Sequence, residues 1–250
     1  DAFAGAGKHI SKTRGEYVPG SPSKALGVTP PFEEYHFIDL DQRKYRLLQE
    51  LTDDRDDVHV YHGDCNEVLI KNVFPKVRYE DFRRALCLLD PYGLHLDWNV
   101  IWTAGHMMTI DMFLNFPVHD MNRNVLWRNP ERVNPKQMER MNRFWGDDSW
   151  KKVAYEPSPQ LSLFEPPRKE KQSIEKIVQA FRQRLRTVAG FEYVPPPMPF
   201  KNTRDATLYY LFFASQKPVA EKIVKDIFKK YAVNVTRYLD SIQQESNDSS

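Results

Sequence analysis

The chain has 250 residues, of which 41% are hydrophobic and 28% charged, enough to bury a full core in one elaborated domain. Lysine and arginine number 36 against 34 acidic residues, so the overall charge does not decide for or against nucleic acid, and any basic surface must be local. No apolar run reaches the roughly 18 residues of a membrane span and no signal peptide precedes the fold, so no membrane partner is expected. Cys65 and Cys87, at the expected ends of neighbouring strands, lack metal-ligand spacing and a disulfide pattern, so we expect a reduced, cytoplasmic setting and no metal site.

The sequence opens on a Gly-x-Gly turn, Asp1-Ala2-Phe3-Ala4-Gly5-Ala6-Gly7. It follows what would be a first strand, whose beginning we expect to lie before Asp1. Glycines there admit positive φ and let the backbone approach a ligand. A tight turn that holds no ligand explains the same pattern equally well.

The segment from Lys8 to Gly20 is too polar to be core, and we expect an inserted loop. Its cations, which include Lys8, Lys12 and Arg14, either hold a phosphate backbone or are simply solvated. The pair Ser21-Pro22 has the form of an N-cap followed by proline at the first helical position, which predicts a short helix.

The next two strands are predicted to end in acids. Residues 35–41 form the second strand, and the carboxylate of Asp39, or that of Asp41 as runner-up, would accept hydrogen bonds from ribose hydroxyls. An amphipathic helix follows. Residues 58–66 form the third strand and run into Gly63-Asp64, where Asp64 either meets an adenine amino group or caps a helix.

A fourth, buried strand, residues 85–89, runs into Asp90-Pro91-Tyr92-Gly93. This arrangement fits attack by the exocyclic amino group of a nucleobase on an electrophile. Such an amino group needs hydrogen-bond acceptors for its two hydrogens, because they free the nitrogen lone pair. Asp90 and the Pro91 carbonyl are the candidate acceptors. Tyr92 would stack on the base, contributing about 1–3 kcal/mol. An ordinary strand-to-loop turn is the alternative. Strands that end in glycine or acid and alternate with helices predict a parallel sheet whose carboxyl edge is a ligand crevice.

The second half adds a helix over residues 98–104 and a fifth strand over residues 109–115, where Asn115 contacts a substrate or satisfies a loop. Cations and rings then interleave, the arrangement that holds phosphates and stacks bases. The alternative is an amphipathic helical insertion whose rings pack on the sheet. The cations are Arg123, Arg128, Arg132, Lys136, Arg140, Arg143, Lys151 and Lys152, and the rings are Trp127, Phe144, Trp145 and Trp150.

The end of the chain is predicted to close the sheet. Residues 157–167 contain four prolines and form an extended linker. Apolar residues at three- and four-residue steps predict a helix over 174–188, and residues 190–194 and 208–214 an antiparallel hairpin. A final helix runs from Val219 to Tyr231, followed by a frayed tail.

These motifs resemble a known class of enzymes. The first turn, the acid of the second strand, Gly63-Asp64 and Asp90-Pro91-Tyr92 come in the order found in class I S-adenosylmethionine-dependent methyltransferases. The stretch Tyr17-Val18-Pro19-Gly20-Ser21-Pro22 resembles the ribosomal-RNA adenine-N6 methyltransferases. A narrower resemblance is to the bacterial three-Cys-motif partner family (TcmP), carried over nearly the whole chain by Asp1 to Gly7, Gly20-Ser21-Pro22, Phe37 to Asp41, Asp90 to Gly93, Asn115-Phe116-Pro117 and Leu208 to Ser215.

The resemblance implies an α/β fold with a Rossmann-like class I methyltransferase sheet, mostly parallel with a C-terminal antiparallel hairpin, plus a helical insertion. Residues 1–122 would form the cofactor-binding half of the core, 123–169 the basic, aromatic insertion and linker, 170–240 the rest of the core, and 241–250 a disordered tail. It also implies a partner protein with a three-cysteine motif, compatible with an iron–sulfur centre.

The implied cofactor is S-adenosylmethionine. Gly5 and Gly7 would admit its amino-acid end, Asp39 its ribose and Asp64 its adenine, with Asp1 and Phe3 also on the cofactor side. Asp90, Pro91 and Tyr92 are the catalytic candidates, and the substrate-binding candidates are Lys8, Lys12, Arg14, Asn115, Arg123, Trp127 and Arg128.

The expected reaction is methylation of a nucleobase amino group in DNA or RNA. The resemblance of Tyr17 to Pro22 to the adenine-N6 enzymes favours adenine N6 as the target. Those enzymes usually carry Asp-Pro-Pro-aromatic, whereas Asp90-Pro91-Tyr92-Gly93 is similar to the Asp-Pro-Phe-Gly of transfer-RNA guanine-N2 methyltransferases, so guanine N2 is the alternative. Tyr92 stands one position earlier than the aromatic residue of the adenine-N6 pattern. This difference motivates a rival hypothesis, in which the protein is a cofactor-binding or scaffolding subunit without methyl transfer of its own. A Rossmann-type oxidoreductase is disfavoured because the first turn lacks the third glycine.

Overall fold

The computed structural model describes residues 1–10, 17–157, 169–202 and 204–231. Its largest sheet has the order β5 (Ala85–Leu89), β6 (Ile110–Phe116), β10 (Thr207–Ala214) and β9 (Met198–Lys201). The pair β5 and β6 is parallel, whereas β10 runs antiparallel to both of its neighbours. A second, parallel pair is formed by β3 (Tyr35–Asp39) and β4 (Val58–His62).

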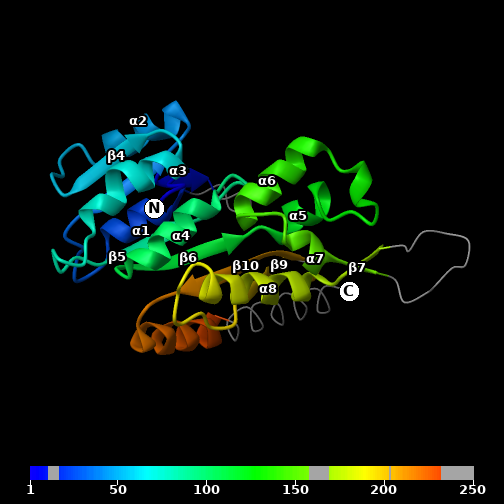
Figure 1. Ribbon diagram of the computed structural model, residues 1–250. Helices are drawn as coiled ribbons and strands as arrows, with labels where there is room; N and C mark the ends of the chain where they lie inside the picture. Colours follow the sequence, from blue (N-terminus) through cyan, green and yellow to red (C-terminus); the bar gives the residue numbers. More distant parts are fainter. Residues whose placement is uncertain (11–16, 158–168, 203, 232–250) are drawn as a thin grey trace, which may run out of the picture.

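Residues 1–4 join the two groups of strands. The amide of Ile38 in β3 donates to the Asp1 carbonyl and the amide of Ala4 donates back to Ile38, both at 3.0 Å. On the other side, the amide of Ala2 donates to the carbonyl of Leu88 in β5 at 3.0 Å. The spatial order is therefore β4, β3, residues 1–4, β5, β6, β10, β9, a mixed and mostly parallel α/β arrangement (Figure 1).

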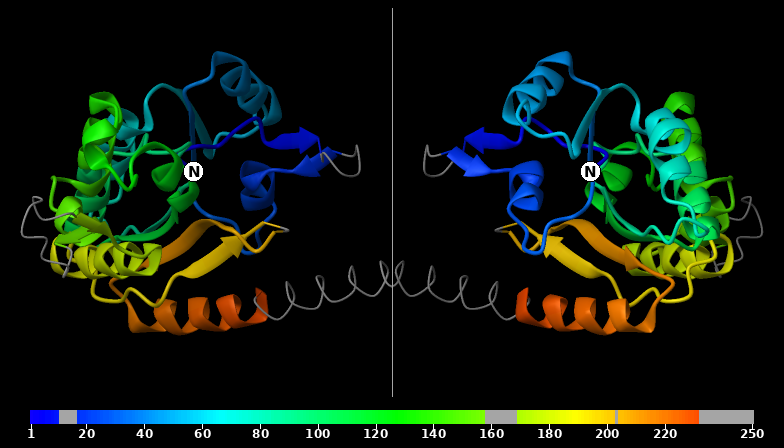
Figure 2. Two further views of the ribbon diagram at one scale, coloured as in Figure 1. Left: turned by 90° about the vertical axis from the view of Figure 1, so that its right-hand side faces the viewer. Right: turned by 90° about the vertical axis from the view of Figure 1, so that its left-hand side faces the viewer.

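The alternation of side chains in β6 gives the sheet two different faces. Ile110, Met112, Leu114 and Phe116 are buried in the main core, which α4 (Trp98–Met107) and α8 (Ile174–Thr187) help to form. The residues between them, among them Phe113 and Asn115, point to the opposite face. Figure 2 shows the helix of residues 218–231 along the β9 and β10 side of the molecule.

The remaining described elements are helices, helical turns and strands that surround these sheets. The helices and helical turns are α1 (Ser21–Leu26), α2 (Gln42–Leu51), α3 (Cys65–Val68), η1 (Leu69–Val73), η2 (Phe74–Lys76), α5 (Val118–Asn124), η3 (Pro130–Arg132), α6 (Pro135–Trp145) and α7 (Trp150–Ala154), and the strands are β1 (Lys8–Ile10), β2 (Tyr17–Pro19), β7 (Tyr155–Pro157) and β8 (Lys169–Lys171). No helix in the described ranges is long and apolar enough to cross a membrane.

Rings of the insertion belong to the main core. Phe144, Trp145 and Trp150 are at most 2% exposed. Phe144 stacks on Phe181 of α8 at 5.6 Å between ring centroids, and Phe181 lies 4.5 Å from Phe116 of the sheet. The prediction that these three insertion rings stack on bases is therefore wrong, and the packing alternative holds for them.

Four local predictions need correction. The strand β10 pairs with β9 rather than with residues 190–194, which contribute only a bridge from Tyr193 to Ser215. The inserted segment after Gly7 contains an antiparallel pair, β1 and β2, and Cys65 lies in α3 rather than at a strand end. Gly20, not Ser21, is the N-cap of α1, because the Ser21 hydroxyl donates to the Asp1 carboxylate. The linker core, residues 158–168, and the tail lie outside the described residues.

Candidate functional site

The loops after β4 and β5 are tied together at the carboxyl edge of the sheet. Asn66 is buried, and its Nδ2 donates to the carbonyl of His95 at 3.0 Å. Its Oδ1 accepts from the amide of Asp97 at 2.8 Å. These bonds hold the loop that begins at Asp90 against the end of β4, so the edge is preorganised.

The first turn and the end of β3 also meet there. Oδ2 of Asp39 accepts from the amide of Gly5 at 2.9 Å, and Oδ1 accepts from the amide of Asp41 at 2.8 Å. Asp39 is only 8% exposed. Because a carboxylate has about four acceptor sites, these bonds leave capacity for hydroxyl donors. Asp41, the runner-up, instead caps α2 by accepting from the amides of Arg43 and Lys44.

The two glycines of the turn have different surroundings. Both have positive φ, +69° at Gly5 and +74° at Gly7. A Cβ at Gly5 would meet nothing within 4 Å, whereas one at Gly7 would lie 2.6 Å from Cδ2 of Leu51. Gly7 therefore serves packing against α2, and Gly5 is the glycine that faces open space.

The other proposed cofactor residues have local partners. Oδ1 of Asp1 accepts from the amide of Phe3 at 3.2 Å, and Oδ2 accepts from the Ser21 hydroxyl. Phe3 is half-buried against the main core. Asp64 caps α3 by accepting from the amide of Asn66 at 2.9 Å, so the capping role considered for it is present in the structure.

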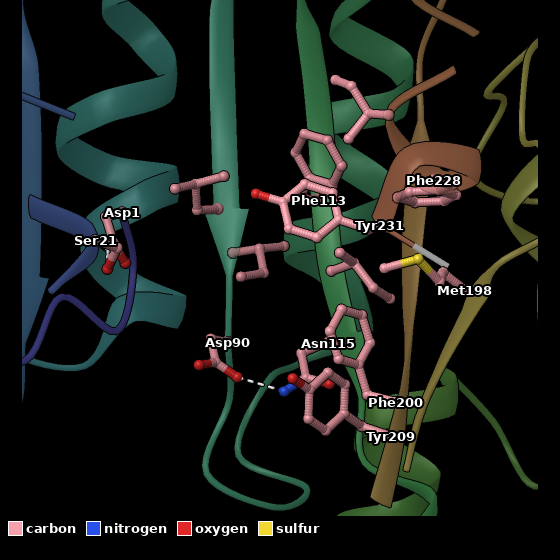
Figure 3. A pocket seen from close by; sticks show the side chains of 14 residues that line it. Asp1, Ser21, Asp90, Phe113, Asn115, Met198, Phe200, Tyr209, Phe228 and Tyr231 are labelled. Atoms are coloured by element: carbon pink, nitrogen blue, oxygen red, sulfur yellow. Dashed lines mark hydrogen bonds between the residues drawn. The ribbon is translucent and has the colours of Figure 1, made fainter. Parts of the chain in front are cut away.

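A cavity of about 390 Å³ lies on the sheet face that the helix of residues 218–231 partly covers. Such a volume is in the range of small-molecule pockets. Its polar side chains are Asp1, Ser21, Asp90 and Asn115, and its rings come from β6, β9, β10 and the last helix: Phe113, Phe200, Tyr209, Phe228 and Tyr231 (Figure 3).

Asp90 and Asn115 form a pair of acceptors at one end of this cavity. Nδ2 of Asn115 donates to Oδ1 of Asp90, as the dashed line in Figure 3 marks. Oδ1 of Asn115 is buried and accepts no hydrogen bond from any described residue. Leaving a buried acceptor unsatisfied costs about 1–3 kcal/mol. Because this atom is buried, a donor from a ligand would reach it only after the Asn115 amide or a neighbouring side chain moves.

Two rings lie beside this pair. Phe200 and Tyr209 stack with centroids 4.8 Å apart and an interplanar angle of 14°. Burial, reinforced by the negative charge of Asp90, raises the pKa of the Tyr209 phenol, so the ring stays neutral. No sequence motif assigns a role to these two residues, although the alternation of Tyr209, Leu211 and Phe213 in β10 predicts that all three share one face.

The residues after Asp90 are placed differently from one another. Pro91 is buried, but Tyr92 is 88% exposed and does not line the cavity. The ring of Tyr92 lies 6.4 Å from that of His95. Stacking of Tyr92 on a base within this cavity would therefore require a different rotamer or loop position.

The basic candidates lie away from the cavity or outside the described residues. Arg123, Trp127 and Arg128 are exposed at the end of α5 and do not line the cavity. Trp127, 42% exposed, donates from Nε1 to the Arg123 carbonyl at 2.8 Å. The backbone of Lys8 lies in β1, and Lys12 and Arg14 fall in residues 11–16, which are not described.

Comparison with protein-family models finds none that matches the chain, and comparison with curated proteins finds no match either. At Gly5 and Asp39, open space adjoins a buried carboxylate with remaining acceptor capacity.

Proposed function

We propose that this protein is an S-adenosylmethionine-dependent methyltransferase that acts on an exocyclic amino group of a nucleobase. The observation that carries the proposal is the pair of acceptors, Asp90 and Oδ1 of Asn115, at the end of a ring-lined cavity. An amino group attached to a purine or pyrimidine offers two N–H donors and one flat face, which matches two acceptors beside stacked rings.

Each of these residues would have a distinct role. Asp90 and Asn115 would accept the two N–H bonds, which draws the nitrogen lone pair out of conjugation and aims it at the electrophile. Phe200 and Tyr209 would stack on the base, at about 1–3 kcal/mol per base. The new N–C bond would form as the methyl–sulfur bond breaks with its electron pair left on sulfur, and the nitrogen would lose one proton, which the exposed Asp90 carboxylate can take and pass to water.

The cofactor, when bound, supplies a methyl group on a sulfonium, which is already a good electrophile. In this proposal the open space in front of the Gly5 Cα leaves room for the cofactor, and the Asp39 carboxylate accepts hydrogen bonds from the ribose hydroxyls of the cofactor. Asp1 and Ser21, which line the cavity, would hold the end of the cofactor that lies nearest to Asp90. The protein then contributes mainly proximity and orientation.

The arrangement of the sheet supports the same proposal. Residues 1–4 sit between β3 and β5, so the glycine turn, Asp39 and Asp90 follow adjacent strands. In open α/β sheets, ligands bind outside the carboxyl ends of such strands. The antiparallel β10 and β9 add the face that carries Tyr209 and Phe200.

The test is transfer of labelled methyl from S-adenosylmethionine into mixed DNA and RNA, followed by digestion to nucleosides. We expect label in N6-methyladenine, or in N2-methylguanine as the alternative, and a loss of at least about 100-fold in Asp90→Asn and in Asn115→Leu. Asp53→Asn, an exposed acid in the turn after α2, is the matched control and should keep full activity. Equal transfer by wild type and Asp90→Asn would contradict the proposal.

The rival function, a cofactor-binding or scaffolding subunit for a three-cysteine partner, is favoured by one observation, the exposure of Tyr92 outside the cavity. Calorimetry separates the two. S-adenosylmethionine binding that Asp39→Ala abolishes, with no methyl transfer by wild type unless the partner is added, would support the rival. Transfer by the isolated wild type would exclude it.

A further inference from the structure

A second cluster of chemically active side chains lies at the amino end of β3, away from the cavity. It contains Glu34, just before β3, His36 in β3 and His59 in β4. In the parallel register His36 pairs with His59, and their rings stack with centroids 4.9 Å apart. Asp39 lies three residues farther along β3, about 10 Å from His36 at the rise of a strand.

The ligand atoms of the three residues converge. Oε2 of Glu34 lies 3.3 Å from Nε2 of His36 and 3.4 Å from Nε2 of His59. Two ligands at about 2.0–2.1 Å from a tetrahedral ion are about 3.4 Å apart, so both distances equal an edge of a zinc tetrahedron. All three atoms lie within 4.8 Å of one another, which a small rotation of the imidazoles can reduce.

Two neighbours orient these ligands as outer partners of a metal site do. Nδ1 of His36 lies 3.2 Å from the hydroxyl of Tyr61, which leaves Nε2 directed at Glu34. Nη1 of Arg83 donates to Oε1 of Glu34 at 2.8 Å, so the other carboxylate oxygen remains for a metal. The side chains of His36, Glu34 and His59 are 14%, 26% and 36% exposed, so an ion can enter from solvent.

We propose that Glu34, His36 and His59 form a binding site for Zn²⁺, with three protein ligands and water in the fourth position. Two imidazoles and one carboxylate are a ligand set that zinc accepts. The competing interpretation is a metal-free cluster in which Glu34 accepts one hydrogen bond from each imidazole. The positive charges of Arg83 and Lys76, which act on Glu34, oppose a cation and favour that interpretation.

The two interpretations differ in calorimetry with zinc chloride, performed on the full chain without an affinity tag. We expect one Zn²⁺ per chain and a Kd that rises more than about 100-fold in His59→Gln. The amide of glutamine can keep the hydrogen bond to Glu34 but replaces a metal ligand, so the variant separates ligation from folding. His62→Gln, on the same strand and outside the cluster, is the matched control and should bind as wild type does.

Two further readouts test the geometry. Tyr61→Phe should raise the Kd roughly 10-fold, because the hydroxyl that accepts from Nδ1 of a metal-bound His36 is lost. Co²⁺ in place of Zn²⁺ should give the strong visible absorption of a tetrahedral site in wild type and lose it in His59→Gln.

The result that overturns the proposal is specific. No zinc binding by wild type, or binding that His59→Gln leaves unchanged, would establish the metal-free cluster. Neither result would bear on the methyl-transfer proposal, because Asp90 and Asn115 lie in the cavity at the other edge of the sheet.

Discussion

Replacing Phe181 with alanine should destabilise the main core, which joins the four-stranded sheet to the insertion, as one unit. This side chain is fully buried, and its ring lies 4.5–5.9 Å from five others between centroids. The five rings come from α4, the sheet and the insertion: Trp98, Phe116, Phe144, Trp145 and Phe212. Removing such a phenylalanine costs about 3–5 kcal/mol, and we expect a value near 4 because neighbours on all sides prevent the cavity from collapsing.

Urea unfolding followed by circular dichroism and by tryptophan fluorescence measures this loss. With a slope near 2 kcal/mol per M, the midpoint should fall by about 2 M, and both signals should move together. Phe82→Ala, at a position 90% exposed, is the control and should change the free energy of unfolding by less than about 0.5 kcal/mol. A loss below about 1 kcal/mol, or fluorescence that changes in a separate transition, would refute the single core of sheet and insertion.

Three further predictions follow from local geometry. Gly7→Ala should lower thermal stability more than Gly5→Ala, because both incur the roughly 1–2 kcal/mol cost of positive φ but only Gly7 also lacks room for a Cβ; equal melting temperatures would contradict this. The amides of α2 lower the pKa of the capping Asp41 below its ordinary 3.8, so its charge stabilises the fold at pH 7 and this contribution is lost as the pH falls through the lowered pKa; the advantage in melting temperature over Asp41→Asn should shrink below pH 4. Burial raises the pKa of Cys65 to about 12 and that of Cys87 to about 11, so at pH 8 a thiol reagent should label neither until denaturant is added, and labelling of the native protein would refute the packing of these thiols.

Much of the strand layout was predictable because it depends on local patterns. The runs around Phe37, Val60, Cys87 and Met112 form strands where they are expected, and the carboxyl-edge positions of Asp39 and Asp90 follow from where those strands end. The period of apolar residues in α8 likewise predicts a helix within one residue of its observed ends.

The parts that sequence could not predict depend on pairing between distant segments. Three prolines at 195–197 have no N–H to donate, so the strand that pairs with β10 begins only at Met198. The buried rings Phe144 and Trp145 follow the same pattern of cations and rings that a base-binding surface would show, and only their partner Phe181, farther along the chain, identifies them as core residues. His36 and His59 give no spacing signal because parallel register, not sequence distance, brings them together.

The seam formed by residues 1–4 has a consequence for cooperativity. In the described part of the chain, β3 and β5 share no ladder, so these four residues carry the backbone bonds between the two halves of the sheet. Breaking a few hydrogen bonds would release β3 and β4 as a separate opening unit of low local stability. Asp39 lies on one side of this seam and Asp90 on the other. A ligand bound by both carboxylates would therefore connect the two halves of the sheet. Its binding free energy would add to the free energy that is needed to unfold β3 and β4 locally.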